Sequence, residues 1–491
     1  MGVSEKPGLL DNRLWAGKAF DGAWSTALST ARDVVEPATG QVFSRVGIAS
    51  AADMQAAIGR AHQAQAAWAA TGPRERAAVF HRAARAFEQH FDELAMTVAR
   101  ETGGIVPKGQ HEVREAITLC QLAAGLPMQS QGHVLPSTPG RLSIARRVPH
   151  GVVGVISPFN FPLILGLRSV APALALSNAV VLKPDTRTSV SGGFMMARVF
   201  EEAGLPKGLL QVLPGDAEAG EALVVDERVP MIAFTGSPMV GRRIGALAGQ
   251  HLKKVSLELG GANNLIILED ADLDAASSAA AFGAWFHQGQ ICMASNRILV
   301  HESIAEGILQ RLVGKATHLP VGDGASGQVA LGRMIDAKQL QRFDQVIQDS
   351  VAQGAKLEAG GTYEGLGYKP TVLSGVKPGI RSFDEEPFGP VANLVTFRTD
   401  DEAVQLANTS QGGLAAAVIS PDVGRAMAIG QRLRAGMVHI NDQTVNDECT
   451  NPFGGPGVGG NGGSVGGPAD IEEYTQWQWV TVKDAPPAFP F

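Results

Sequence analysis

Two side chains that are capable of covalent chemistry on a carbonyl group stand in short runs of the chain. Cys292 ends the run 287–292, and Glu258 lies in the run 257–261. A thiolate is a nucleophile and a carboxylate can act as a general base, which together are the minimum for oxidising a carbonyl compound through a thioester. A free cysteine is more often a small buried hydrophobic residue, so the rest of the chain has to support the chemical interpretation.

Composition predicts an ordinary globular protein of two or three domains. The chain has 491 residues, of which 45% are hydrophobic and 18% are charged. A net charge of −7 gives no electrostatic reason to expect nucleic acid or an anionic membrane as a partner. Cys120, Cys292 and Cys449 are widely spaced and form no CxxC pair. This pattern argues against a metal site and a disulfide framework, and it favours a reducing compartment.

Targeting signals are not recognisable in the sequence. The first 25 residues contain no apolar core of signal-peptide length, and Lys6 stands where a myristoylation signal needs serine or threonine. No stretch reaches the ~18 uninterrupted apolar residues that a membrane span requires. We therefore expect a cytoplasmic protein.

Strands alternate with helices along most of the chain, which predicts an α/β fold with two doubly wound parallel sheets. Residues 51–100 carry the apolar spacing of helices. The first run of expected strands and helices comprises 152–156, 179–182, 190–203, 209–213, 231–234, 255–259 and 265–268. The second run begins near residue 272 and comprises 298–300, 336–353, 391–397 and 437–440.

Three other segments do not fit this alternation. Residues 128–149 place turn residues between short extended runs, which predicts a projecting β-hairpin. The tail 471–482 alternates like a strand, and we expect it to pair with the hairpin of a neighbouring subunit, because either segment alone would be an exposed edge. A homodimer or homotetramer follows from this pairing. The glycine-rich composition of 454–467 predicts a flexible loop.

Two segments at predicted strand ends have both a structural and a chemical interpretation. Ser237, before Pro238, can cap a helix, or it can bind a phosphate group at the helix N-terminus. Lys183 follows strand 179–182, at the edge where open α/β sheets bind ligands, although a solvated lysine is the simpler interpretation. The GxGxxG turn of common dinucleotide-binding proteins is absent.

Two further polar segments are open in the same way. Asn160, inside the proline- and phenylalanine-rich run 157–162, suits a rigid oxyanion donor or a turn asparagine. The run 385–390 is either an acidic turn or the source of a carboxylate that positions a ligand.

Taken together, these segments resemble the aldehyde dehydrogenase superfamily over about residues 35–480. The motifs stand in the order of that family at 158–162, 234–237, 257–261, 289–292 and 386–390. The resemblance implies that Cys292 is the nucleophile, that Glu258 is the general base, and that Asn160 donates to the oxyanion. It implies an NAD(P)-binding domain at 1–127 and 150–257, a catalytic domain at 258–454, and an oligomerisation element at 128–149 and 455–491.

The resemblance also implies a set of cofactor-binding residues. Lys183 matches the lysine on the adenosine ribose, Ser237 the serine at the pyrophosphate, and Glu386 and Phe388 the pair beside the nicotinamide and its ribose. The expected set is Ser157, Pro158, Lys183, Thr186, Thr235, Gly236, Ser237, Gly260, Glu386 and Phe388.

Position 186 leaves the choice of cofactor open. Thr186 stands where many NAD-specific relatives carry a glutamate, which removes a barrier to a 2′-phosphate. Arg187 would favour that phosphate if it turned toward it, whereas Asp185 would replace the lost carboxylate and repel it. We expect NAD to be preferred, with measurable activity with NADP.

The substrate class is predicted from aromatic residues. By the family pattern, the substrate tunnel would include Phe159, Phe161, Trp285, Phe286 and Phe453. The run 440–448 resembles the benzaldehyde and vanillin dehydrogenase branch. An aromatic wall without a cation suits a flat neutral aldehyde. The alternatives are that these aromatics are core residues, that the substrate is a semialdehyde or an aliphatic aldehyde, or that the protein is a catalytically silent binding or structural relative.

Overall fold

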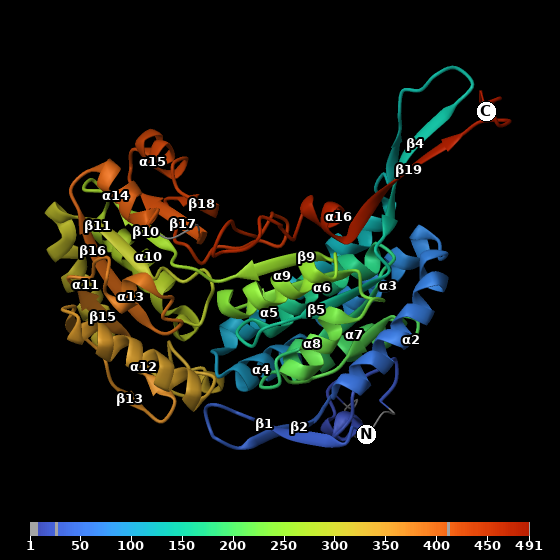
Figure 1. Ribbon diagram of the computed structural model, residues 1–491. Coiled ribbons are helices and arrows are strands. Elements are labelled where there is room, and N and C mark those ends of the chain that lie inside the picture. The colour runs from blue at the N-terminus through green and yellow to red at the C-terminus, as the bar shows by residue number, and fades with distance from the viewer. Residues whose placement is uncertain (1–7, 25–27, 410–412, 491) are drawn as a thin grey trace.

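The computed structural model describes residues 8–24, 28–409 and 413–490 of the chain. Two large sheets covered by helices form the bulk of the molecule, and a narrow three-stranded sheet projects from it (Figure 1). This architecture confirms the predicted α/β class. The domain boundaries stay a prediction, and the one between residues 257 and 258 falls inside strand β9.

The first sheet is parallel throughout, with the strand order β7-β6-β5-β8-β9. Its strands are β5 (Val152–Ile156), β6 (Ala179–Lys183), β7 (Leu210–Val212), β8 (Met231–Gly236) and β9 (Lys254–Leu259). All five residues of β5 and all 14 residues of helix α6 (Pro162–Ala175) are buried. Continuous apolar runs are required here because helices cover both faces of a parallel sheet.

The second sheet has seven strands in the order β12-β15-β16-β11-β10-β17-β18. Only β12 pairs antiparallel. The strands are β10 (Asn264–Ile267), β11 (Arg297–His301), β12 (Lys356–Ala359), β15 (Thr371–Ser374), β16 (Val391–Phe397), β17 (Gly413–Ile419) and β18 (Ala435–Ile440). The sequence analysis placed 265–268 in the first run of strands, which is wrong, because β10 lies between β11 and β17.

Helices pack on both sheets and account for the predicted helical segments. Those packed with the first sheet are α2 (Ala51–Ala69), α3 (Pro73–Gln89), α4 (Phe91–Thr102), α5 (Val106–Gly125), α6, α7 (Met195–Glu202), α8 (Ala217–Val225) and α9 (Pro238–Gln250). Those of the second half are α10 (Leu273–Trp285), α11 (Ala305–His318), α12 (Ala337–Ala352), α13 (Arg381–Asp384), α14 (Asp400–Ala407) and α15 (Val423–Gly430). Smaller elements are α1 (Asn12–Trp15), the hairpin β1 (Thr30–Val35) and β2 (Val42–Ile48), the π-helical turn η2 (Val190–Phe194), and the pair β13 (Tyr363–Glu364) and β14 (Gly367–Tyr368).

The projecting sheet joins the predicted hairpin to the C-terminal strand of the same chain. It consists of β3 (Gly132–Val134), β4 (Leu142–Pro149) and β19 (Thr475–Val482), which follows helix α16 (Ala469–Tyr474). Strand β19 pairs antiparallel with β4, from Thr475 opposite Pro149 to Val482 opposite Leu142. The expectation that the tail pairs with the hairpin of a neighbouring subunit is therefore wrong, because one chain completes this pairing.

The glycine-rich segment 454–467 is packed, and the expectation of a flexible loop is wrong. The carbonyl of Gly459 accepts the N–H of Leu259 at 3.0 Å, and the Asn461 side chain bonds the backbone of Leu257 and Val255. A Cβ atom at Gly460 would lie 2.5 Å from the Leu257 carbonyl oxygen, so the close approach to β9 requires glycine there. Composition alone could not reveal this neighbour.

No helix within the described residues is long and apolar enough to cross a membrane. Over the same residues, no group of three or more histidine, cysteine, aspartate or glutamate side chains is placed to hold a metal ion.

Candidate active site

Cys292 follows a strained turn at the junction of the two halves of the molecule. His287, Gln288 and Gly289 have φ angles of 47°, 55° and 63°, in the left-handed region. Non-glycine residues adopt this region at a cost, so the surroundings must hold the turn. The Gln288 amide donates to the carbonyls of Gly103 and Arg333 at 2.7 and 2.9 Å. These bonds tie the turn to α4 and the loops beside it.

Two asparagine side chains fix the backbone around Cys292. The Asn160 amide nitrogen donates to the Gln290 carbonyl at 2.9 Å. An amide carries two N–H groups, so this bond leaves Asn160 one further donor. The Asn263 amide nitrogen donates to the Cys292 carbonyl at 2.7 Å, and its oxygen accepts the N–H of Ala415 at 2.9 Å. The sequence analysis missed Asn263, although it lies two residues after the 257–261 run.

Glu258, in β9, is only 4% exposed. Neither carboxylate oxygen has a hydrogen-bond partner among the described residues. Burial raises the pKa of Glu258 well above its usual range, and the positive charge of Arg168 partly opposes this rise. A buried carboxyl without partners is unfavourable for folding, so its free lone pairs are available to a water molecule or a ligand.

Cys292 is half-buried, and its thiol is held in the neutral form. Burial raises its pKa, and the negative charges of Glu386, Asp447 and Glu258 add to the effect. Because the thiolate is the nucleophilic form, its formation at neutral pH needs a proton acceptor.

Arg168 is a buried cation in this region that the sequence analysis missed. It lies on α6, is 2% exposed, and forms an ion pair with Asp447 at 2.8 Å. Its guanidinium group stands 4.7 Å from the centre of the Phe453 ring. Its Nε and Nη1 atoms have no hydrogen-bond partner within the described chain. The segments that supplied the predicted aromatic wall contain no cation, but Arg168 brings one beside Phe453 from α6. Its signal in the sequence was one arginine in a mainly apolar helix.

The aromatic residues predicted to line the substrate tunnel lie in different environments. Trp285 is buried in the core of the second sheet, where its indole N–H donates to the Thr371 carbonyl at 3.3 Å, so it is a core residue. Phe286 stacks on the partly exposed Phe282. Phe161 packs edge-on against His287, with ring centres 5.2 Å apart.

Phe159 lies on the side of the predicted cofactor site. Its ring meets that of Phe388 at 5.9 Å, and the Arg187 guanidinium stands 4.2 Å from its centre. Phe453 contacts Arg168 and Phe161 contacts His287, so these two remain candidates for the substrate wall.

The predicted cofactor residues lie mainly at the carboxyl ends of the strands of the first sheet. Ser157 and Pro158 follow β5, Lys183 ends β6, and Thr235 and Gly236 end β8. The Ser157 hydroxyl is buried without a hydrogen-bond partner in the described structure. The exposed Ser237 caps α9 by accepting the N–H of Val240 at 3.4 Å, which bears out the capping interpretation and leaves the phosphate interpretation untested.

Glu386 approaches this sheet from the second half of the molecule. A Cβ atom at Gly260 would lie 2.3 Å from the Glu386 carboxylate, so the contact requires a glycine. Burial raises the pKa of Glu386 to about 8, and its Oε1 atom has no partner among the residues described. Phe388, two residues on, has a φ angle of 53°.

Arg187 and Asp185 are engaged with each other and not with an open site. The Arg187 guanidinium bonds Asp185 and also Asp336, each at 2.8 Å. Both side chains are thus paired within the protein, and a role of either in selecting a 2′-phosphate or a 2′-hydroxyl stays a prediction. Thr186 instead accepts an N–H of Arg32 at 3.0 Å.

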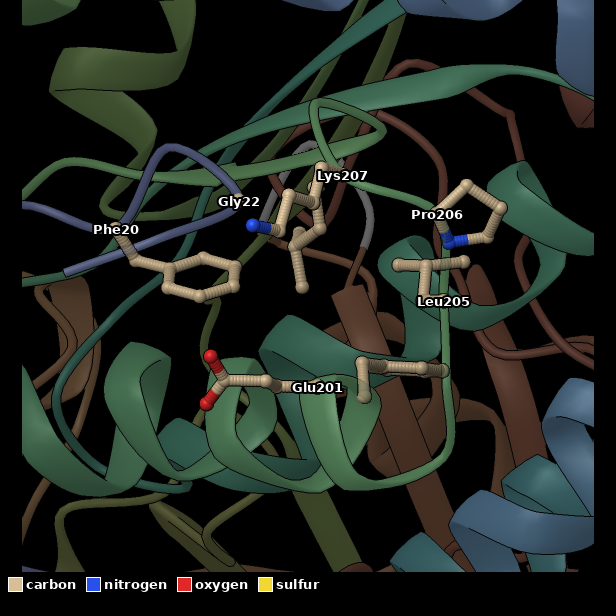
Figure 2. A pocket seen from close by; sticks show the side chains of 8 residues that line it. Phe20, Gly22, Glu201, Leu205, Pro206 and Lys207 are labelled. Carbon is tan, nitrogen blue, oxygen red and sulfur yellow. The ribbon is translucent and has the colours of Figure 1, made fainter.

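Of two cavities in the described structure, one adjoins a predicted site residue and the other does not. One, of about 290 Å³, is lined by Pro238, Gly261, Ala262, Arg297, Pro378, Phe383, Asp384, Glu386, Thr409 and Val458, and therefore adjoins Glu386. The other, of about 120 Å³, is lined by Phe20, Gly22, Phe200, Glu201, Leu205, Pro206, Lys207 and Leu210. Figure 2 shows its apolar side chains, with Glu201 and Lys207 as the charged groups, and no predicted site residue lines it.

The chain is similar to known proteins in sequence and in fold. The model of the aldehyde dehydrogenase family matches residues 24–480. A vanillin dehydrogenase of Amycolatopsis sp. is 52% identical over 98% of this chain and 99% of its own, and a benzaldehyde dehydrogenase [NAD(+)] of Pseudomonas putida is 47% identical over 97% and 98%. The structure of a salicylaldehyde dehydrogenase of Pseudomonas putida G7, complexed with salicylaldehyde, is similar with a TM-score of 0.93 and 33% identity, covering 97% of this chain and all of that one. The chain thus belongs to the aldehyde dehydrogenase family.

Proposed function

We propose that the protein oxidises an aromatic aldehyde to the carboxylate, with NAD as the hydride acceptor, through a thioester on Cys292. The observation that carries this proposal is the pairing of a loop-held cysteine with Glu258, a buried carboxyl whose two oxygens have no partner in the described structure. Such a carboxyl has no structural use and suits activation of water beside an acyl-enzyme.

In the proposed reaction, the Cys292 thiol loses its proton to solvent, either directly or by way of Glu258, and the resulting thiolate attacks the aldehyde carbon. The free N–H of Asn160 and the backbone N–H of Cys292 stabilise the oxyanion of the thiohemiacetal. NAD supplies the acceptor for the hydride that leaves this carbon. Glu258 then takes a proton from water, and the resulting hydroxide displaces the thiolate from the thioester and forms the carboxylic acid. The proton held by Glu258 returns to the thiolate, and the acid loses its own proton to solvent.

The residues present fit a dinucleotide. The Ser157 hydroxyl and Glu386 Oε1 are buried polar atoms without partners in the described chain, and Gly260 gives Glu386 the space to approach. Lys183 brings a cation to the carboxyl end of β6, where sheets of this type bind ligands. In this proposal, Lys183 and Thr186 face the adenosine ribose, Thr235, Gly236 and Ser237 face the pyrophosphate, and Ser157, Pro158, Gly260, Glu386 and Phe388 face the nicotinamide half.

An aromatic substrate is supported by Phe161 and Phe453 and by the similarity to vanillin and benzaldehyde dehydrogenases. A semialdehyde is a second candidate, because Arg168 is a buried cation beside Phe453 that could meet a substrate carboxylate. Its ion pair with Asp447 already neutralises that charge, which favours the aromatic aldehyde.

Reduced cofactor formation with benzaldehyde, vanillin and succinic semialdehyde tests the substrate. We expect kcat/KM for the two aromatic aldehydes to exceed that for succinic semialdehyde by more than about tenfold. A carboxylate loses its hydration on entering a buried apolar site, and a neutral wall offers no interaction that replaces it. A preference for succinic semialdehyde would overturn the aromatic assignment, and no turnover with any aldehyde would favour a silent relative.

We also propose a homo-oligomer in the cytoplasm. The β3-β4-β19 sheet projects with exposed Val134, Trp477 and Trp479, and it ends in two unpaired edges, so a second copy has a surface to cover. Three free cysteines support a reducing compartment. Light scattering at micromolar concentration tests the assembly, and a monomeric mass would contradict it.

A further inference from the structure

Arg32, on strand β1, reaches the proposed adenosine end of the cofactor site from the N-terminal hairpin. One of its nitrogens donates to the Thr186 hydroxyl at 3.0 Å and to Asp216 at 2.9 Å, and a second nitrogen donates to the other Asp216 oxygen at 2.8 Å. The pair is thus bidentate, which fixes both side chains in one geometry. Three elements that are distant in the sequence meet here.

Asp216 stands at the start of a helix but does not cap it. It is the N-cap residue of α8, yet its side chain makes no capping hydrogen bond and turns to Arg32 instead. An N-cap aspartate normally accepts an N–H of the first helical turn, which stabilises the helix by about 1 kcal/mol. The carboxylate bonds Arg32 in place of this cap.

Lys183 lies in the same corner. A Cβ atom at Gly220 of α8 would be 3.2 Å from the Lys183 Cε atom, so the lysine stem runs along α8. The charges of Asp185 and Asp216 both act on its ammonium group. Asp185 pairs with Arg187, whereas Asp216 shares one Arg32 nitrogen with the Thr186 hydroxyl, which places the Asp216 carboxylate beside Thr186.

From these contacts we infer that the Arg32–Asp216 pair decides whether the enzyme accepts a 2′-hydroxyl or a 2′-phosphate on the cofactor, with Asp216 supplying the carboxylate that position 186 lacks. The inference rests on the proposed assignment of Lys183 to the adenosine ribose. Asp216 accepts a hydrogen bond from the 2′-hydroxyl and repels a phosphate dianion. While Asp216 holds Arg32, the guanidinium is not available to that phosphate.

Removing the charge of Asp216 without removing its shape should reverse the selection. In Asp216→Asn, Arg32 and Lys183 lose the opposing charge of Asp216, and Asp185, which pairs with Arg187, is the carboxylate that still acts on both. Two cations that are less opposed favour a phosphate. In Arg32→Met, Asp216 loses its partner and its negative charge acts in full. Arg32 and Asp216 are 45% and 58% exposed, so neither variant should disturb the fold.

The matched control is Asp33→Asn. Asp33 lies next to Arg32 on the same strand, so its side chain points to the opposite face, where it pairs with Arg45 at 3.2 Å. The control changes the net charge as Asp216→Asn does and keeps the same hairpin.

Calorimetric binding of ADP-ribose and of its 2′-phosphorylated form tests the inference without any turnover. We expect the wild type to bind ADP-ribose the more tightly, and Asp216→Asn to shift the ratio of the two dissociation constants by about tenfold toward the phosphorylated ligand at low salt. Arg32→Met should bind the phosphorylated ligand more weakly than the wild type does. Asp33→Asn should leave the ratio of the two dissociation constants within about twofold of wild type.

The possible failures are distinguishable. If Asp216→Asn keeps the wild-type ratio while both ligands bind, the pair does not select the cofactor, although the proposed function stands. If the wild type binds neither ligand, the cofactor assignment itself fails and this inference fails with it.

Discussion

Carboxylates occupy two contrasting environments in this protein. At the junction of the two halves, the buried Glu258 and the half-buried Glu386 have oxygens without hydrogen-bond partners in the described structure. At the rim, Asp216 and Asp185 are each held by an arginine at 2.8 Å. Unpartnered buried acids oppose folding, whereas paired acids at the rim are nearly neutral for stability. The proposed roles follow this difference, with the unpartnered acids assigned to reaction and ligand binding and the paired acids to the adenosine end of the cofactor.

The largest expected effect comes from removing the interior nucleophile. Cys292→Ala should lower turnover by a factor on the order of 10⁴ or more, because no thioester can form, while NAD binding stays near that of wild type. Steady-state rates and cofactor titration check the two parts. Cys120→Ala is the control, since Cys120 is buried in the core and should leave the rate unchanged. Substantial activity of Cys292→Ala would move the nucleophile elsewhere.

The stability of the interior should depend on pH through Glu386. Burial raises its folded-state pKa to about 8, so its favourable contribution is complete below the unfolded pKa near 4.5 and is lost as the pH rises toward 8. Glu386→Gln cannot ionise and should therefore exceed wild type by about 2–4 kcal/mol at pH 8, with little difference at pH 4.5.

Urea denaturation at the two pH values measures this difference. The matched control is Glu385→Gln, because Glu385 is an exposed neighbour that pairs with Arg381 at 3.1 Å and should shift stability by less than about 1 kcal/mol. An equal gain for both variants, or a gain at pH 4.5, would contradict the contrast between interior and rim.

A smaller effect is expected from Arg168, which pairs with Asp447 and whose charge acts on Glu258. Its charge lowers the pKa of Glu258, so Arg168→Met should raise that pKa further and move the acidic limb of the pH–rate profile to higher pH. Arg168→Lys keeps the charge and should move the limb less. An unchanged limb in Arg168→Met would show that the limb belongs to another group.

Regular elements were predictable from the sequence because their signals are local. The strand 152–156 and the strand 391–397 coincide with β5 and β16, since β-branched runs bounded by turn residues can hardly form anything else. What failed depended on distant neighbours. The packing of 454–467 on β9, the pairing of β19 with β4, and the placement of β10 are tertiary contacts that no local pattern specifies.

The site shows the same division. Motifs in the family's order allowed Cys292, Glu258 and Asn160 to be selected, and the structure brings Asn160 into contact with the loop of Cys292. Arg168 and Arg32 were missed, because each acts through partners 279 and 184 positions away, Asp447 and Asp216. Trp285 shows the reverse error, in which an aromatic residue near a motif belongs to the core.

The most direct test of the account is a single-turnover experiment with Glu258→Gln and benzaldehyde. Acylation does not need the base for water, whereas deacylation does, so we expect a burst of about one reduced cofactor per subunit and then a stall. Mass spectrometry of the quenched protein should place a benzoyl group on Cys292. A normal steady state without stalling, or an adduct on another residue, would contradict the assignment of Glu258 and Cys292.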